Sequence, residues 1–104
     1  MRKLEYRRPR RPVSFTVEFL SNGEILRGLC RDVTDAGLRV DFDGRAIIGT
    51  SGTLTLRHPT RVFSIKATIA YLDNAHTVLT FLFDTPQERG TAAQFFTSIA
   101  PLQR

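Results

Sequence analysis

The sequence predicts a mainly β protein in which six antiparallel strands close on one another and one α-helix follows at the C-terminal end. Two observations predict this class. Apolar and polar residues alternate along most of the chain up to Phe83, which is the pattern of half-buried strands. After Thr85 the apolar residues recur at helical spacing instead. Six strands joined largely by short connections favour an antiparallel barrel or sandwich, because closure hides the hydrogen-bonding edges.

The first three strands are expected at residues 13–20, 24–33 and 38–43. In the first of them, an apolar residue stands at every second position from Val13 to Phe19. The dipeptide Asn22-Gly23 that follows tolerates the positive φ angles of a two-residue hairpin. Gly28, in the middle of the second strand, indicates a bulge or the close approach of another backbone.

The remaining strands are expected at residues 53–57, 63–71 and 79–83. In the fifth strand, apolar residues from Phe63 to Tyr71 occupy alternate positions and are predicted to face inward. The loop at residues 44–51 carries Ile47 and Ile48, and we expect both side chains to lie beneath it.

The last segment carries the signals of a helix start. Thr85 is a suitable N-cap, Pro86 suits the first helical position, and Glu88 completes a capping box. Four apolar residues then recur at the i, i+3, i+4, i+7 spacing, namely Ala92, Phe95, Phe96 and Ile99. We therefore expect a helix of about four turns with one apolar face packed on the barrel.

The basic residues are concentrated at the N-terminal end. The 104-residue chain has a net charge of +5, and residues 1–11 contain six basic residues and one acidic residue. The rest of the chain holds nine of each, so the predicted barrel is neutral. Most of the basic residues at this end are arginines, whose planar fork of donors suits phosphate oxygens and purine edges. An anionic ligand is favoured, with a solvated basic tail as the alternative.

The other reactive residues give no sign of catalysis. Cys30 is the only cysteine, so it cannot form an internal disulfide or begin a zinc site, and we expect it to be buried. His58 and His76 stand near turns, and no histidine, carboxylate and nucleophile arrangement is identifiable. We expect no enzyme activity, no metal and no cofactor. Without a long apolar run or a signal peptide, we expect no membrane insertion and a cytoplasmic location.

Two polar motifs are expected to lie over the same surface. The first is Arg7-Arg8-Pro9-Arg10-Arg11, in which proline disfavours a helix. The second is Asp32-Val33-Thr34-Asp35-Ala36-Gly37, a turn between the second and third strands. In a meander these strands neighbour the first, so the turn can lie beside the arginines. Taken alone, the turn has the composition of an ordinary hairpin connection.

At these two motifs the sequence resembles the PilZ domain family, bacterial receptors for cyclic di-GMP. The signature of that family is Arg-x-x-x-Arg, followed farther along by Asp/Asn-x-Ser/Ala-x-x-Gly. Arg7 and Arg11 match the first motif, and Asp32, Thr34 and Gly37 match the second. The resemblance covers essentially the whole chain, because the family also has a six-stranded antiparallel β-barrel with a C-terminal α-helix.

The resemblance implies a receptor for cyclic di-GMP that performs no catalysis. The implied ligand-binding residues are Arg7, Arg8, Arg10, Arg11, Asp32, Thr34 and Gly37. The arginines would clamp phosphates and guanine edges, and the turn would contact a guanine edge. Residues 1–12 would form a mobile ligand-binding segment, and residues 13–104 a single barrel domain. Ordering of the segment on binding would create a surface for an effector protein in motility, biofilm or exopolysaccharide control.

The sequence departs from the family pattern at two places. Thr34 stands where serine or alanine is usual, and its methyl group could crowd a base. Pro9-Arg10-Arg11-Pro12-Val13 also resembles a frequent Pro-Arg-x-Pro-Val sequence of the family, which would give the main role to Arg10. Two alternatives stay open. One is a PilZ-type scaffold at a type IV pilus or flagellar motor that binds no nucleotide. The other is a small single-stranded nucleic-acid binder, which the neutral barrel disfavours.

Overall fold

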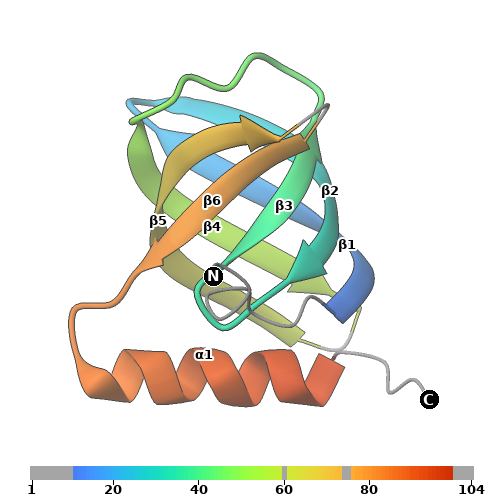
Figure 1. Ribbon diagram of the computed structural model, residues 1–104, viewed down its shortest axis with the longest axis vertical. Helices are drawn as coiled ribbons and strands as arrows, with labels where there is room; N and C mark the ends of the chain where they lie inside the picture. Colours follow the sequence, from blue (N-terminus) through green and yellow to red (C-terminus); the bar gives the residue numbers. More distant parts are fainter. Residues whose placement is uncertain (1–10, 60, 74–75, 100–104) are drawn as a thin grey trace, which may run out of the picture.

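The computed structural model describes residues 11–59, 61–73 and 76–99. Within these residues the chain forms β1 (Arg11–Ser21), β2 (Glu24–Val33), β3 (Gly37–Phe42), β4 (Ser51–His58), β5 (Arg61–Asp73), β6 (His76–Leu82) and α1 (Pro86–Ile99). The strands close into one antiparallel barrel, and α1 lies across one end of it (Figure 1). The predicted six-stranded barrel with a C-terminal helix is confirmed.

The order of the strands around the barrel differs from their order in the chain. The order is β1-β2-β3-β6-β5-β4, so β3 pairs with β6 and β4 pairs back with β1. The connection from β3 to β4 crosses the end of the barrel opposite α1 (Figure 1). Because the barrel is closed, each strand has a hydrogen-bonded neighbour on both sides and no edge is exposed.

The core follows the predicted inward faces. Phe15, Val17 and Phe19 of β1 are at most 4% exposed, and Leu54 and Leu56 of β4 are fully buried. Burial of each such side chain stabilises the fold by about 1.5–3 kcal/mol relative to leaving it in water. The hydrophobic effect along alternating strands therefore accounts for most of the barrel.

The predicted details of β2 and its hairpin are also confirmed. Asn22 and Gly23 both have positive φ, as a two-residue hairpin requires. Gly28 lies where a Cβ atom would overlap the backbone of Asp41 on β3, so its strands approach closely. Cys30 is fully buried, and burial raises the pKa of its thiol. This cysteine is therefore a core residue.

The helix is attached to the barrel through aromatic rings. Phe96 stacks on Phe81 of β6 with ring centroids 5.4 Å apart, and Phe95 stacks on Phe63 of β5 at 4.9 Å. Such pairs contribute about 0.5–1.5 kcal/mol beyond the area they bury.

In the described ranges, no helix has the length and apolar composition needed to cross a membrane.

The start of α1 carries the predicted cap. The backbone N–H of Glu88 donates to the hydroxyl oxygen of Thr85 at 3.2 Å. The carboxylate of Glu88 in turn accepts from the backbone N–H of Asp84 at 2.7 Å. Thr85 thus caps the helix as predicted, whereas Glu88 reaches the N–H of Asp84, one residue before the N-cap, in place of the N–H of Thr85 that a capping box would use.

The predicted inward orientation of Tyr71 is wrong. Its side chain is 48% exposed on the outer face of β5. A β-bulge is the cause, because Ile69 pairs with Leu79 while Tyr71 pairs with Val78, the next residue of β6. Ala70 is the extra residue of this bulge, and it reverses the alternation of the residues that follow.

The prediction that Ile47 and Ile48 lie beneath their loop is also wrong, since they are 64% and 57% exposed. The backbone of the loop is tied to β5 instead. The N–H of Gly49 donates to the carbonyl of Ile69 at 2.8 Å, and the N–H of Ile69 donates to the carbonyl of Thr50 at 2.9 Å. These bonds fix the path of the loop along β5, and in this path the two isoleucines face outward.

Candidate functional site

The pairing of β1 with β2 places the last residue of the arginine motif beside the second motif. Arg11 lies opposite Val33, and Pro12 lies opposite Asp32. Strand β1 thus begins at Arg11, two residues before the strand expected from the sequence. The arginine run therefore joins the barrel directly beside the aspartate that begins the second motif.

Arg11 is the one residue of the first motif that lies within the described part of the chain. Arg7, Arg8 and Arg10, together with most of the segment predicted to be mobile at residues 1–12, lie outside the described residues. Their assignment to a ligand site stays a prediction, as does the division into a segment and a barrel at residue 13.

The second motif forms a tight turn between β2 and β3. The backbone N–H of Thr34 donates to the carbonyl of Gly37 at 2.8 Å. The hydroxyl oxygen of Thr34 accepts from the N–H groups of Ala36 and Gly37 at 3.0 and 3.1 Å. Thr34 is 9% exposed, so this hydroxyl primarily holds the shape of the turn.

The packing of β3 against β6 explains why residue 37 is a glycine. A Cβ atom at this position would overlap the carbonyl oxygen of Leu79 on β6. The close pairing of β3 with β6 therefore requires glycine here, with or without a ligand. The motif residues Thr34 and Gly37 thus set the path of the backbone where β2 ends and β3 begins.

Asp32 is a largely buried carboxylate, 7% exposed, at the end of β2. Arg31 is the extra residue of a bulge, so that Asp32 lies opposite Arg39 of β3. Arg39 donates to Oδ2 of Asp32 from Nη2 at 2.6 Å and from Nε at 3.0 Å. Withdrawing a carboxylate from water is costly, and this bidentate guanidinium compensates for the loss of hydration.

Arg39 also reaches a second carboxylate. Its Nη1 donates to Oδ2 of Asp73, the last residue of β5, at 2.9 Å. The hydrogen bonds to Asp32 and then to Asp73 raise the pKa of the Arg39 guanidinium, although partial burial opposes them. The sequence reasoning missed both Arg39 and Asp73. Arg39 could have been found, because the alternation of the strand after the motif places its side chain outward. Asp73 could not, because it lies on a strand far along the chain from the motif.

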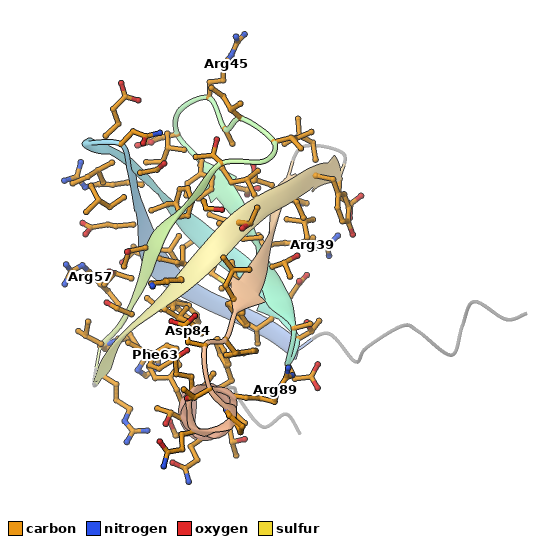
Figure 2. The ribbon with its side chains drawn as sticks, turned by 90° about the vertical axis from the view of Figure 1, so that its left-hand side faces the viewer. Arg39, Arg45, Arg57, Phe63, Asp84 and Arg89 are labelled. Carbon is orange, nitrogen blue, oxygen red and sulfur yellow. The ribbon has the colours of Figure 1, made fainter. Side chains whose placement is uncertain are left out.

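A depression of about 170 Å³ lies on the outer face beside the turn. Its lining residues are Thr34, Ala36, Gly37, Leu38, Tyr71, Val78, Leu79 and Thr80. Val78 lies opposite both Arg39 and Tyr71 in the strand ladders. Asp32, Arg39, Val78 and Tyr71 therefore form one row across the outer face of β2, β3, β6 and β5, which we call the outer row. Figure 2 shows Arg39 on this side of the barrel.

The outer row offers a ligand two kinds of contact. The half-exposed ring of Tyr71 provides a surface on which a planar base can stack. Asp32 and Arg39 provide a charged pair beside the turn. The bulge that turns Tyr71 outward could not be read from the alternation, which is why the sequence reasoning assigned this ring to the core.

A second ion-pair cluster lies next to the outer row. Asp41 of β3 accepts from Nε of Arg31 at 2.6 Å and is hydrogen-bonded to Nδ1 of His76. The hydrogen bond from Arg31, and then that from His76, lowers the pKa of the Asp41 carboxyl. This cluster ties β3 to β2 and to the first residue of β6.

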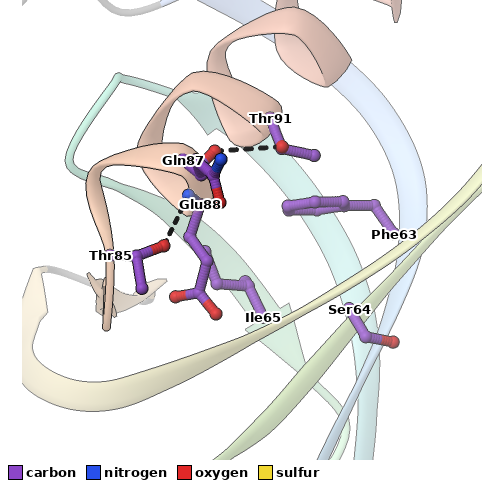
Figure 3. A pocket seen from close by; sticks show the side chains of 7 residues that line it. All are labelled: Phe63, Ser64, Ile65, Thr85, Gln87, Glu88 and Thr91. Atoms are coloured by element: carbon purple, nitrogen blue, oxygen red, sulfur yellow. Dashed lines mark hydrogen bonds between the residues drawn. The ribbon is translucent and has the colours of Figure 1, made fainter.

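A larger groove of about 440 Å³ lies between β5 and α1 (Figure 3). It is lined by Phe63, Ser64, Ile65, Thr85, Gln87, Glu88 and Thr91. Its polar groups serve the helix, because Thr85 and Glu88 form the cap and the hydroxyl of Thr91 donates to the carbonyl of Gln87 at 3.0 Å. Size alone therefore does not make this groove the better candidate.

Among the described residues, no group of three or more histidine, cysteine, aspartate or glutamate side chains gathers in a way that could hold a metal ion. The candidate site is the outer row with the adjoining turn, which combines the charged pair of Asp32 and Arg39 with the half-exposed ring of Tyr71.

Comparisons with known proteins bear on the fold. Neither a family model nor a curated protein matches the sequence. Among solved structures, the chain is similar to the crystal structure of the PilZ domain of CeSA from a cellulose-synthesizing bacterium. The TM-score is 0.72 at 16% sequence identity, and the match covers 86% of this chain and 96% of that chain. The resemblance expected from the two motifs and the strand pattern is thereby confirmed for the fold, and this chain has a PilZ-like β-barrel.

Proposed function

We propose that this chain is a receptor that binds cyclic di-GMP on the outer row and performs no catalysis. One observation carries the proposal: Pro12 lies opposite Asp32, so the arginine run joins the barrel beside a buried carboxylate. A guanine base offers N–H donors to a carboxylate, and the phosphates of the nucleotide suit guanidiniums. The PilZ-like fold supports the same ligand, because the resembled family includes bacterial receptors for cyclic di-GMP.

In this proposal each part of the site has a separate task. The arginines at residues 7–11 bind the phosphates and guanine edges, each charge-assisted hydrogen bond contributing about 1.5–3 kcal/mol. Asp32 accepts from a guanine N–H. The ring of Tyr71 stacks on a base, a contact that contributes about 1–3 kcal/mol in other proteins. Thr34 and Gly37 keep the turn close to the ligand.

Signalling follows from ordering of the N-terminal segment. When the arginines close over a ligand on the outer row, residues 1–10, which precede β1, cover a face of the barrel and present a new surface. An effector protein that recognises this surface reads the concentration of the nucleotide. We propose a cytoplasmic adaptor of this kind, acting in motility, biofilm or exopolysaccharide control.

The test is calorimetric titration of the whole chain with cyclic di-GMP at near-physiological salt. We expect saturable binding of micromolar affinity or tighter, which GTP and short single-stranded DNA do not displace. Arg11→Ala and Asp32→Asn should each weaken it by about tenfold or more.

Two results would contradict the receptor proposal. Absence of any heat of binding with cyclic di-GMP would leave the scaffold without a nucleotide ligand as the better reading. Binding of DNA alone, with an affinity that falls steeply as salt rises, would favour the nucleic-acid binder.

A further inference from the structure

We propose that Arg39 is a positioning residue that gives the site its selectivity for guanine by holding the carboxylate of Asp32 in one orientation. This inference rests on the proposed function, since it concerns the same ligand. Arg39 matches neither motif of the resemblance, and its role is inferred from its contacts alone.

The first step is the geometry of the pair. Nε of Arg39 lies 3.3 Å from Oδ1 and 3.0 Å from Oδ2 of Asp32, and Nη2 lies 2.6 Å from Oδ2. A guanidinium is rigid and planar, so two donors on one carboxylate fix the direction of its plane. Rotation of the Asp32 carboxylate would break at least one of these hydrogen bonds.

The second step is that Arg39 is itself held from the other side. Its Nη1 donates to Asp73 at 2.9 Å, and its side chain is only 24% exposed. Arg39 therefore joins the end of β2 to the end of β5 across β3 and β6. A side chain anchored at both ends of its guanidinium cannot follow Asp32 if the carboxylate turns.

The third step is the chemistry of the base. Guanine presents two adjacent donors, N1–H and the exocyclic 2-amino group, and a carboxylate accepts from both only when it lies close to the plane of the base. Hypoxanthine has the same ring and N1–H but lacks the 2-amino group. The hold of Arg39 on Asp32 should therefore appear in the preference for guanine over hypoxanthine, whereas loss of structure would weaken both ligands alike.

The experiment is calorimetry on the whole chain with two probes, cyclic di-GMP and cyclic di-IMP. The native protein should prefer cyclic di-GMP by about tenfold or more. Arg39→Gln should reduce this preference to about twofold, close to that of Asp32→Asn. Arg39→Lys keeps the charge but lacks the planar fork, so its preference for cyclic di-GMP should fall between that of the native protein and that of Arg39→Gln.

A matched control lies on the opposite side of the barrel. Arg57 of β4 also pairs with a carboxylate, that of Glu18, through Nη2 at 3.2 Å, and Figure 2 shows it facing away from Arg39. Arg57→Gln should leave the affinity for both probes within about twofold of the native values. Asp73→Asn removes the negative charge that anchors Arg39 on one side while its contacts with Asp32 remain, so it should lower the preference only in part.

The outcomes separate the two proposals. A native protein that binds neither probe contradicts the proposed function itself. A native protein that binds both equally, or variants of Arg39 that keep the full preference or weaken both probes by the same factor, would overturn the role of Arg39. If circular dichroism shows that Arg39→Gln does not fold, Arg39→Lys and Asp73→Asn decide, and an unchanged preference in both refutes the inference.

Discussion

Arg39 donates a 2.6 Å hydrogen bond from Nη2 to Oδ2 of Asp32, and both side chains are largely shielded from water on the outer face of the barrel. Asp32, the first residue of the second polar motif, thus contributes to the stability of the barrel and is also part of the candidate site. Substitutions at Asp32 consequently change stability and binding together, and the two effects need separate measurements.

The first prediction concerns Asp32 itself. Asp32→Ala should lower the free energy of unfolding by about 2–3 kcal/mol, because it leaves the Arg39 guanidinium half-buried without its main partner. Urea denaturation measures this. Arg57→Ala removes an exposed ion pair with Glu18 and should cost less than about 1 kcal/mol. Equal losses in the two variants would contradict a special role for the buried pair.

The second prediction contrasts two glycines. Gly37→Ala should destabilise the barrel by about 1–3 kcal/mol or more, because its Cβ would overlap the carbonyl of Leu79 and force β3 away from β6. Gly90 lies inside α1, where an added Cβ atom would meet no other part of the protein within 4 Å. Gly90→Ala should therefore stabilise the protein by about 0.5–1 kcal/mol. Thermal unfolding of both variants gives the test, and a tolerated alanine at residue 37 would show that the ladder can relax.

The third prediction concerns acid stability. Arg31 and His76 lower the pKa of Asp41 in the folded protein, so the contribution of this carboxylate is present above its unfolded pKa of about 3.9. It is lost as the pH falls through the lower folded pKa. The difference in Tm between the native protein and Asp41→Asn should therefore be largest near neutral pH and shrink below about pH 4. A difference that stays constant down to pH 2 would contradict the assignment.

The fourth prediction tests the turn. Thr34→Val has nearly the same shape but leaves the N–H groups of Ala36 and Gly37 without their acceptor, so it should cost about 1–3 kcal/mol. Thr34→Ser keeps the hydroxyl and loses only a buried methyl group, so it should change stability by less than about 1 kcal/mol. If the methyl group of Thr34 crowds a base, the serine variant should also bind cyclic di-GMP more tightly. Urea denaturation and calorimetry give the two readouts.

The strands and the helix cap were predictable because their signals are local. Phe15, Val17 and Phe19 are buried by the same alternation that predicts them to be inward. Asn22-Gly23 and the Thr85–Glu88 cap depend on residues at most three positions apart, whose backbone preferences act before any tertiary contact forms. The PilZ-like fold followed from these elements together with the two motifs.

The partners of the site were not predictable from local signals. A single extra residue at Ala70 turns Tyr71 from the core to the outer row, and alternation contains no information about such a bulge. Asp73 reaches Arg39 only because β5 and β3 both pair with β6, although the two residues are 34 positions apart in the chain.

The number of strands, most of their inward faces, the capped helix and the two polar motifs could be predicted from the amino-acid sequence, because periodicity and capping act over a few residues. The pairing of β3 with β6, the outward position of Tyr71 and the contacts of Arg39 with Asp32 and Asp73 depend instead on how distant segments pack against one another. These contacts form because a closed barrel satisfies the backbone hydrogen bonds of every strand at once. This requirement involves all six strands together, so no single segment of the sequence reveals it.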